Sequence, residues 1–342
     1  NSTIQSDTTL GATRRDALEY FAYVEDDYKV NEKLKVNMGL HYSGFNVDRT
    51  SYHSLQPRLS GRYLLSSGFS AKASYVRMAQ FIHLLTNSGV GLPTDLWVPS
   101  TGQIKPQTAE QVAIGLARNY DNGIEISLEV YDKKMDNLIA YKEGASYLSL
   151  DNSWEDRITI GQGRSRGIEL FVGKKKGKLT GWVGYTLSKT TRQFDELNEG
   201  KEFPYRYDRR HDVSIASVYQ IKKGVEISGA WVYGTGNAIT LPIGRYLGTS
   251  PNAGGFSGSE VQIYDGRNGF RTRAYHRLDL SISWTKDKGK KGTRTWSLGA
   301  YNTYSRANPF FVNVSYDRRG NKKFIQYSLF PFIPSVRYSF KF

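Results

Sequence analysis

The histidines and glycines of this sequence are the residues that could form a metal site or a nucleotide site. Their spacing predicts neither. No two histidines have the spacing of an H-E-x-x-H zinc motif. The stretch Gly161-Gln-Gly163-Arg-Ser-Arg-Gly167 loosely resembles a dinucleotide-binding loop, yet it precedes a predicted strand instead of opening a helix. We expect its glycines to ease a loop into a tilted strand. The histidines, each expected in a loop or facing a polar interior, are His41, His53, His83, His211 and His276.

The remaining signals for catalysis are equally weak. The acidic run Glu25-Asp26-Asp27 lacks the spacing of a calcium loop, so we expect a solvated rim there. The chain contains no cysteine and no phosphate-binding loop. We therefore predict that the protein is not an enzyme and has no catalytic, metal-binding or cofactor-binding residue.

Aromatic residues in the long connections are the remaining candidates for binding. Such side chains could stack on a sugar or a chelate ring, or they could pack the loops against each other, and the sequence leaves both possibilities open. No ligand-binding residue is therefore singled out. The aromatic residues concerned are Trp97, Tyr147, Trp154, Tyr246, Phe256 and Tyr264.

The elements that carry these residues alternate apolar and polar side chains with a period of two. At the C-terminus, Val336, Tyr338, Phe340 and Phe342 interleave with serine, arginine and lysine. No useful stretch has a helical period, so the chain is predicted to be all-β. Thirteen strands are expected, at 16–28, 33–45, 54–66, 69–82, 107–120, 123–141, 164–174, 177–192, 207–221, 224–239, 273–287, 294–316 and 322–342.

The connections between these strands alternate between short and long. Short turns such as Asp121-Asn-Gly123 alternate with long loops, as in outer-membrane barrels, whereas a soluble β-sandwich has no reason to gather its long loops at one end. We therefore predict a transmembrane antiparallel β-barrel. The expected long loops are 46–53, 83–106, 142–163, 193–206 and 240–272.

Composition agrees with a barrel and argues against other classes. The chain of 342 residues has a mean hydropathy of -0.53, 39% hydrophobic and 13% aromatic residues, and no apolar run long enough for a membrane helix. The net charge of +15 first suggests nucleic acid, but most positive charge falls in the short turns. We therefore expect no nucleic-acid partner.

The odd number of strands predicts that part of the barrel is missing. Bacterial single-chain barrels use an even number of strands, with both ends in the periplasm. With a periplasmic C-terminus, thirteen strands place the start of the first one outside the cell. We expect residues 1–15 to be the remnant of an outward loop, and residues 1–342 to be the C-terminal portion of a larger barrel domain.

Several motifs resemble strand signatures of TonB-dependent outer-membrane transporters, and they occur in the order which that family shows. The C-terminal stretch most resembles members from the Bacteroides group. The motifs are Ser54-Leu-Gln-Pro57-Arg58-Leu-Ser60, Gly163-Arg-Ser-Arg-Gly167-Ile-Glu169-Leu, Tyr205-Arg-Tyr-Asp208-Arg-Arg-His211-Asp, Tyr275-His-Arg277-Leu-Asp279-Leu, Tyr301-Asn302-Thr-Tyr304-Ser-Arg-Ala-Asn308-Pro309 and Tyr338-Ser-Phe340-Lys-Phe342.

The resemblance implies a barrel of 22 strands in the outer membrane of a Gram-negative bacterium, with an N-terminal plug that this chain lacks. It implies TonB-driven import of a scarce, large solute: a glycan, a peptide, an iron chelate or cobalamin. The implied partners are the TonB complex, the barrel assembly machinery, outer-membrane lipid and a surface lipoprotein. Tyr338, Phe340 and Phe342 match the family's assembly signal. A passive porin-like barrel and an outer-membrane adhesin or enzyme are the alternatives.

Overall fold

The computed structural model describes residues 15–86, 95–143, 145, 153–252, 255–289, 292–319 and 321–342. Within these residues the chain is built from β-strands and three single-turn 3₁₀ segments, η1 (Ser66–Gly68), η2 (Trp154–Arg157) and η3 (Asn198–Gly200). None of the described helical segments is long and apolar enough to cross a membrane.

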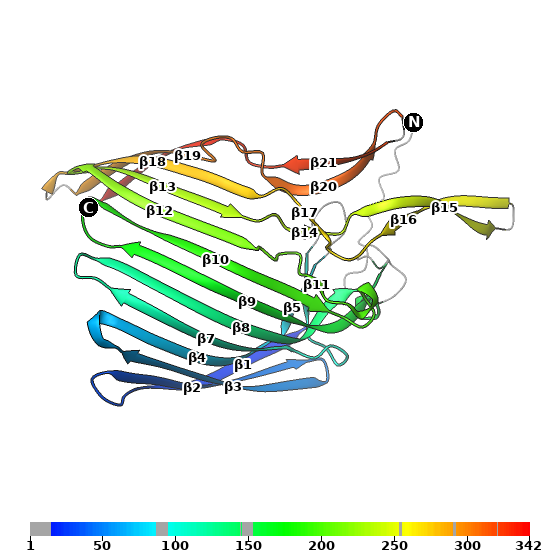
Figure 1. Cartoon of the computed structure of the whole chain (residues 1–342), viewed down its shortest axis with the longest axis horizontal. Helices are drawn as coiled ribbons and strands as arrows, with labels where there is room; N and C mark the ends of the chain where they lie inside the picture. Colours follow the sequence, from blue (N-terminus) through cyan, green and yellow to red (C-terminus); the bar gives the residue numbers. More distant parts are fainter. Residues whose placement is uncertain are drawn as a thin grey trace.

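One curved antiparallel sheet dominates the structure (Figure 1). Each strand pairs with the next, and the two edges are β1 and β22. A two-residue strand, β11 (Phe203–Pro204), joins the sheet beside β10. In sheet order the strands are β1 (Ala17–Lys29), β2 (Leu34–Val47), β3 (Thr50–Leu64), β4 (Phe69–Gln80), β7 (Gln107–Asn119), β8 (Ile124–Tyr141), β9 (Ile158–Lys174), β10 (Leu179–Gln193), β12 (His211–Lys222), β13 (Val225–Gly234), β18 (Tyr275–Asp287), β19 (Thr293–Tyr301) and β22 (Ile333–Lys341).

These strands match the thirteen predicted segments one for one, although several bounds differ: β9 begins at Ile158, inside the loop expected at 142–163. The loop expected at 46–53 is wrong, because β2 and β3 pair up to Val47 and Thr50 and leave only a tight turn. The segments expected at 294–316 and 322–342 were drawn too long, because β19 ends at Tyr301 and β22 begins at Ile333. Between them lies a further long loop, so the alternation of short and long connections, which is broken at the tight turn between β2 and β3, continues from β4 to the last strand.

Four short hairpins lie at the end of the sheet where the long loops gather (Figure 1). Their strands also alternate in polarity, so that from the sequence alone they are predicted as parts of longer strands or as loops. They pair β5 (Ile82–Leu85) with β6 (Leu96–Pro99), β14 (Ala238–Ile239) with β17 (Phe270–Arg271), β15 (Pro242–Asn252) with β16 (Gly255–Tyr264), and β20 (Pro309–Tyr316) with β21 (Lys322–Ser328).

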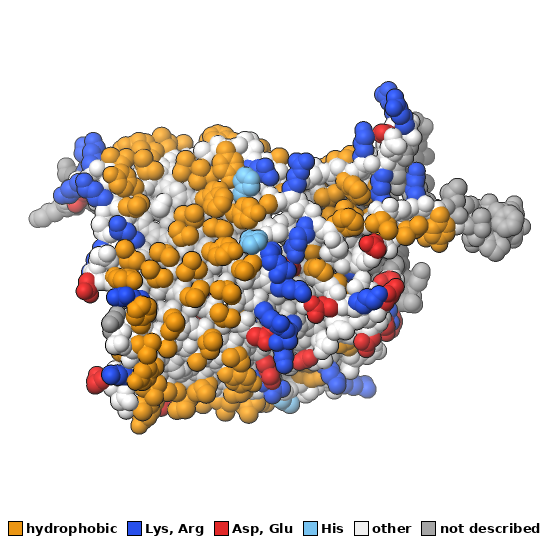
Figure 2. Space-filling view, in the orientation of Figure 1, with side chains coloured by type: hydrophobic (Ala, Val, Ile, Leu, Met, Phe, Trp, Pro, Cys, Tyr) orange, Lys and Arg blue, Asp and Glu red, His pale blue; other side chains and the backbone are white. Residues whose placement is uncertain are grey.

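The two faces of the sheet differ in polarity, as the period of two requires. One face, here called the apolar face, carries solvent-exposed hydrophobic side chains from every strand, such as Ile114 (60% exposed) and Val336 (70% exposed). Figure 2 shows hydrophobic side chains covering much of this face and charged ones at its two ends. An exposed apolar surface of this extent is what a membrane-spanning barrel presents to lipid.

The opposite, polar face carries charged residues from several strands. Strand register places Arg58 and Arg62 on the same face as Glu129, and Arg337 on the same face as Asp279. Several of these charges are paired: Lys175 Nζ lies 2.6 Å from Glu125 Oε2, and Arg277 Nη2 lies 2.9 Å from Asp279 Oδ2. Paired and hydrated charge suits the interior of a barrel.

Candidate functional site

The motif from Tyr205 to Asp212 ties the long loops to the sheet. Asp208 is buried, with 1% of its surface exposed, and its Oδ1 accepts a hydrogen bond of 2.6 Å from the backbone N of Thr190. Its Oδ2 is paired with the guanidinium of Arg271, which also donates to the carbonyls of Asp208 (2.6 Å) and Gly236 (3.1 Å). A carboxylate with a paired guanidinium is the form in which buried charge is stable. This motif therefore holds β10, β12 and the β14–β17 hairpin together.

Two asparagines of the Tyr301–Pro309 motif also tie loop backbone together through their side chains. Asn302 adopts a left-handed conformation (φ 50°), and its Nδ2 donates to the carbonyls of Arg306 (2.9 Å) and Phe330 (3.0 Å). The amide group of Asn308 bridges both backbone groups of His276, at 3.0 Å and 2.9 Å. The motifs that carried the family resemblance thus stabilise loop geometry, because their polar side chains satisfy backbone groups.

The glycines of the stretch 161–167 permit close contact between neighbouring groups. None of the three has a positive φ. A Cβ atom at Gly161 would lie 2.2 Å from the carbonyl O of Gln193, and one at Gly167 would lie 2.7 Å from the Tyr131 ring. They allow close packing, rather than easing a loop into the strand as the sequence suggested.

The histidines do not form a metal site: the described residues contain no cluster of three or more histidine, aspartate or glutamate side chains that could hold a metal ion. Three of them pair with tyrosines near the long-loop end of the apolar face. The paired atoms are Tyr42 Oη and His53 Nδ1 (2.8 Å), Tyr185 Oη and His211 Nδ1 (2.9 Å), and Tyr304 Oη and His276 Nδ1 (2.8 Å). Amphipathic aromatic side chains of this kind are typical of the boundary between lipid and water.

His83 in β5 is fully buried in the long-loop region. Its Nε2 lies 3.0 Å from Ser100 Oγ, and its Nδ1 lies 3.1 Å from Gln107 Nε2. Burial lowers the pKa of His83 from 6.5 to about 4, because the charged form loses its hydration. The neutral ring is therefore the form that fits the β5–β6 hairpin.

We expect acid to loosen this hairpin. Because the folded pKa lies below the unfolded value, the unfolded hairpin binds more protons, and stability falls as the pH drops below about 6.5. The free energy of opening should fall by about 2 kcal/mol between pH 7.5 and pH 5. Amide hydrogen exchange of Ile82–Leu85 measures this change. The variant His83→Gln should lose the dependence, and an equal pH dependence in both proteins would contradict the assignment.

A cavity of about 1120 Å³ opens between three of the long connections, those after β8, β10 and β16. Below it, Leu138, Phe194 and Phe203 form a small apolar cluster. The cavity is lined by Thr86, Tyr141, Lys142, Glu143, Ala145, Asp195, Glu196, Asn198, Glu199, Lys201, Glu202, Phe203, Pro204, Thr240, Tyr264, Asp265, Gly266 and Arg267.

The lining of this cavity is acidic. It carries six carboxylates and three cations, a formal charge of -3. Two of the cations are engaged by neighbouring acids, Lys142 with Glu196 at 3.8 Å and Lys201 with Glu199 at 2.5 Å. The third, Arg267, is desolvated, and its burial lowers the pKa of the guanidinium. Such a lining favours a cationic or hydroxyl-rich solute over an anionic one.

Asn198 organises the cavity wall. Its left-handed backbone (φ 53°) turns the chain after β10. Its Oδ1 accepts from the backbone N of Arg267 (3.0 Å), its Nδ2 donates to the carbonyl of Lys201 (3.2 Å), and its backbone N donates to Glu143 (3.3 Å). A second link joins the loops: the Tyr207 hydroxyl donates a hydrogen bond to the Asp95 carboxylate. The pKa of Tyr207 is raised, mainly because the side chain is buried and secondly because of this hydrogen bond. The loops therefore form one connected unit.

The structure shows where most of the aromatic residues of the long connections lie relative to this cavity. Among the loop aromatics whose side chains the structure describes, only Tyr264 (50% exposed) lines the cavity. Trp97 (61% exposed) and Tyr246 (56% exposed) are exposed elsewhere, while Trp154 packs against the apolar cluster of Leu85, Val98 and Ile139. Tyr147 and the side chain of Phe256 lie outside the described residues. The carboxylates around Asn198 were not identified from the sequence, because they come from loops that the chain brings together only on folding.

Comparison with family models identifies the sheet. Residues 1–303 match the model described as TonB dependent receptor-like, beta-barrel. The chain belongs to this family. Its members are receptors and transporters of the Gram-negative outer membrane and not enzymes, so the apolar face described above is the lipid-facing side of an outer-membrane barrel.

Solved structures show the same fold at low sequence identity. The ferric-catecholate import receptor Fiu from K12 E. coli is 15% identical with a TM-score of 0.59, over 95% of this chain and 44% of the receptor. The pyoverdine receptor FpvA of Pseudomonas aeruginosa PAO1 (14%, 0.58, 95% and 42%) and the FrpB iron transporter of Neisseria meningitidis (14%, 0.55, 95% and 44%) are similar. A comparison with curated proteins finds no match. The chain spans less than half the length of each of these structures.

The C-terminal aromatic residues of this receptor barrel lie along β22. Tyr338 and Phe340 lie on the lipid-facing side, and the polar residues that alternate with them lie on the opposite face. Phe342 follows the strand and is fully exposed. Their role as an assembly signal stays a prediction.

Proposed function

We propose that the chain is the C-terminal part of a 22-stranded TonB-dependent transporter which imports a scarce, large solute across the outer membrane. The observation that carries this proposal is the membership of the family over residues 1–303. Two free sheet edges, β1 and β22, support a barrel completed by further strands. An N-terminal plug would contact TonB, and the paired charges of the polar face would line the space around the plug.

The substrate class is a second part of the proposal. Structures of similar fold are described as receptors for ferric catecholate, for pyoverdine and for ferric citrate, which supports iron chelates as one candidate. The acidic cavity at the long-loop end instead supports cationic or hydroxyl-rich solutes, such as glycans or peptides delivered by a surface lipoprotein. The motif at the C-terminus supports a source in the Bacteroides group, and assembly by the barrel assembly machinery.

Growth of a strain that lacks the protein tests both parts. The strain would be offered ferric catecholate, ferric pyoverdine, ferric citrate, cobalamin, oligosaccharides and peptides in turn. The transporter proposal predicts that one class no longer supports growth, and that deletion of TonB has the same effect. Growth that persists without TonB would instead indicate a passive barrel, and surface binding without uptake would indicate an adhesin.

Tyr264 is the residue through which we expect the cavity to contact this solute. An exposed aromatic ring that stacks on a sugar or chelate ring contributes about 1 kcal/mol, so Tyr264→Ala should raise the half-saturating concentration for uptake about fivefold. Tyr246→Ala is the matched control, since Tyr246 is comparably exposed on the same hairpin and does not line the cavity. Equal effects of the two substitutions would remove Tyr264 from the binding site.

A further inference from the structure

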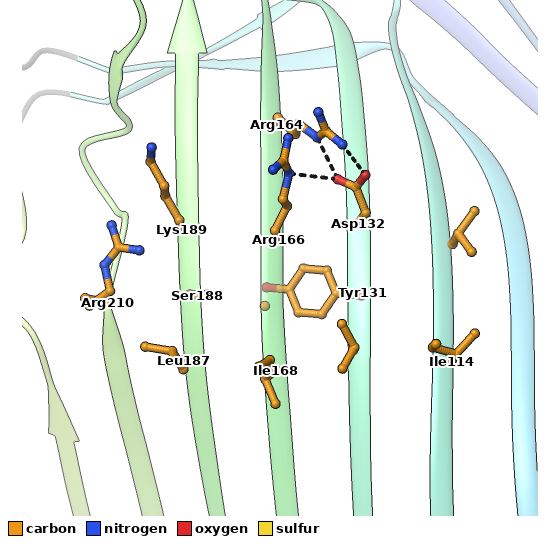
Figure 3. Close-up of a pocket in the computed structure, with 13 residues that line it drawn as sticks. Ile114, Tyr131, Asp132, Arg164, Arg166, Ile168, Leu187, Ser188, Lys189 and Arg210 are labelled. Atoms are coloured by element: carbon orange, nitrogen blue, oxygen red, sulfur yellow. Dashed lines mark hydrogen bonds and ion pairs between the residues drawn. The ribbon is translucent and has the colours of Figure 1, made fainter.

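The lipid-facing side of the sheet has a hollow where its polarity changes. This hollow, of about 550 Å³, spans strands β7 to β10 and reaches Arg210 just before β12 (Figure 3). Its lower part is lined by exposed apolar side chains and its upper part by cations. The lining residues are Val112, Ile114, Val130, Tyr131, Asp132, Arg164, Arg166, Gly167, Ile168, Leu187, Ser188, Lys189 and Arg210.

Strand register shows how abrupt the change of polarity is. Ile114, Val130, Ile168 and Leu187 form one row across four strands. The next row toward the long loops is Val112, Asp132, Arg166 and Lys189. Only two residues, about 7 Å, separate the rows on each strand. The hollow therefore lies at the edge of the apolar belt, where lipid head groups of the outer leaflet begin.

The charge of the upper row is only partly neutralised by the protein. Four cations and one carboxylate line the hollow, a formal charge of +3. The Asp132 carboxylate accepts two hydrogen bonds from Arg164, from Nε to Oδ1 (2.8 Å) and from Nη2 to Oδ2 (2.5 Å). Its Oδ1 also lies 3.5 Å from Arg166 Nε. Lys189 lies 3.5 Å from Glu202, and Arg210 makes no ion pair with any described residue. Cations at a membrane surface are attracted to the anionic head groups of lipids.

We propose that this hollow binds an anionic outer-leaflet lipid, with its phosphate on Arg166, Lys189 and Arg210 and its acyl chains on Ile114, Val130 and Ile168. The planar guanidinium of arginine matches a phosphate through two parallel hydrogen bonds. The three strand spacings from β7 to β10 give a width of about 14 Å, broad enough for more than one acyl chain. The occupant that fits both halves is a phosphorylated lipid with more than one acyl chain.

Binding of lipid A to the intact, detergent-purified protein tests this proposal. The double substitution Arg166→Gln and Lys189→Gln should weaken binding of diphosphorylated lipid A about 30-fold, at about 1 kcal/mol for each lost charge. Arg58→Gln with Arg62→Gln removes the same charge from the polar face and should leave the affinity unchanged. Both double variants must keep the heat-dependent gel mobility of a folded barrel.

Competition separates the possible sources of the signal. We expect that neither inorganic phosphate nor phosphatidylcholine displaces lipid A from the wild-type protein. Displacement by inorganic phosphate would show an anion site without a lipid, and displacement by phosphatidylcholine would show contact with the apolar belt alone. Either result, or equal affinity in the two double variants, would overturn the proposal.

Discussion

Replacing Arg271 by methionine should destabilise the long-loop end of the barrel by about 3 kcal/mol. The substitution leaves the Asp208 carboxylate, 1% exposed, without its cationic partner, and an unpaired buried charge costs about 3 to 5 kcal/mol. We place the effect at the lower end of that range because the backbone N of Thr190 still donates to the carboxylate. Urea unfolding of the intact protein in lipid vesicles measures it.

A surface ion pair supplies the matched control. Lys29 Nζ lies 2.5 Å from Glu32 Oε1 in the first short turn, with both side chains more than half exposed. Lys29→Met removes the same kind of partner, yet exposed pairs contribute about 1 kcal/mol or less. If the two substitutions shift the unfolding midpoint equally, Asp208 is solvated in the native protein and its pairing with Arg271 is not what holds the loops.

The strands were predictable from the sequence because each one has to satisfy only a local rule. Val336, Tyr338 and Phe340 alternate with polar residues whatever their neighbours are, since one face meets lipid and the other the interior. The long connections follow no such period. The β20–β21 hairpin was therefore merged with the strands on either side, because its residues alternate in the same way while pairing with each other and not with the sheet.

The sites depend on contacts between residues that are far apart in the sequence. Asp208 was noticed as part of a motif, but its partner Arg271 is contributed by β17, and nothing in the sequence links the two. The lipid-facing cations were hidden for the opposite reason. Arg166 and Lys189 lie two residues from Ile168 and Leu187, on the same face of their strands, and only the register shows that they share a row directly above those two residues. Sequence periodicity gives the face of a residue but not its height along the barrel.

Replacing Gly161 by alanine should destabilise the barrel by about 3 kcal/mol. The added Cβ would lie 2.2 Å from the carbonyl O of Gln193 and 2.4 Å from the ring of Phe194. Phe194 is 1% exposed and packs against Phe203 and Leu138, so the ring has no free space into which it can move. Overpacking of a closely packed site costs about 1 to 3 kcal/mol, and the backbone contact places this substitution at the upper limit.

Gly61→Ala distinguishes this steric cost from a general effect of glycine replacement. Gly61 also lies within a strand of the main sheet, but a Cβ there would have its nearest neighbour, the carbonyl O of Lys35, at 4.0 Å. This substitution should be neutral or slightly stabilising, because alanine has less conformational freedom to lose on folding. The unfolding midpoint should therefore fall for Gly161→Ala and stay the same or rise slightly for Gly61→Ala. A similar decrease for both would mean that close packing against Phe194 is not the reason for a glycine at position 161.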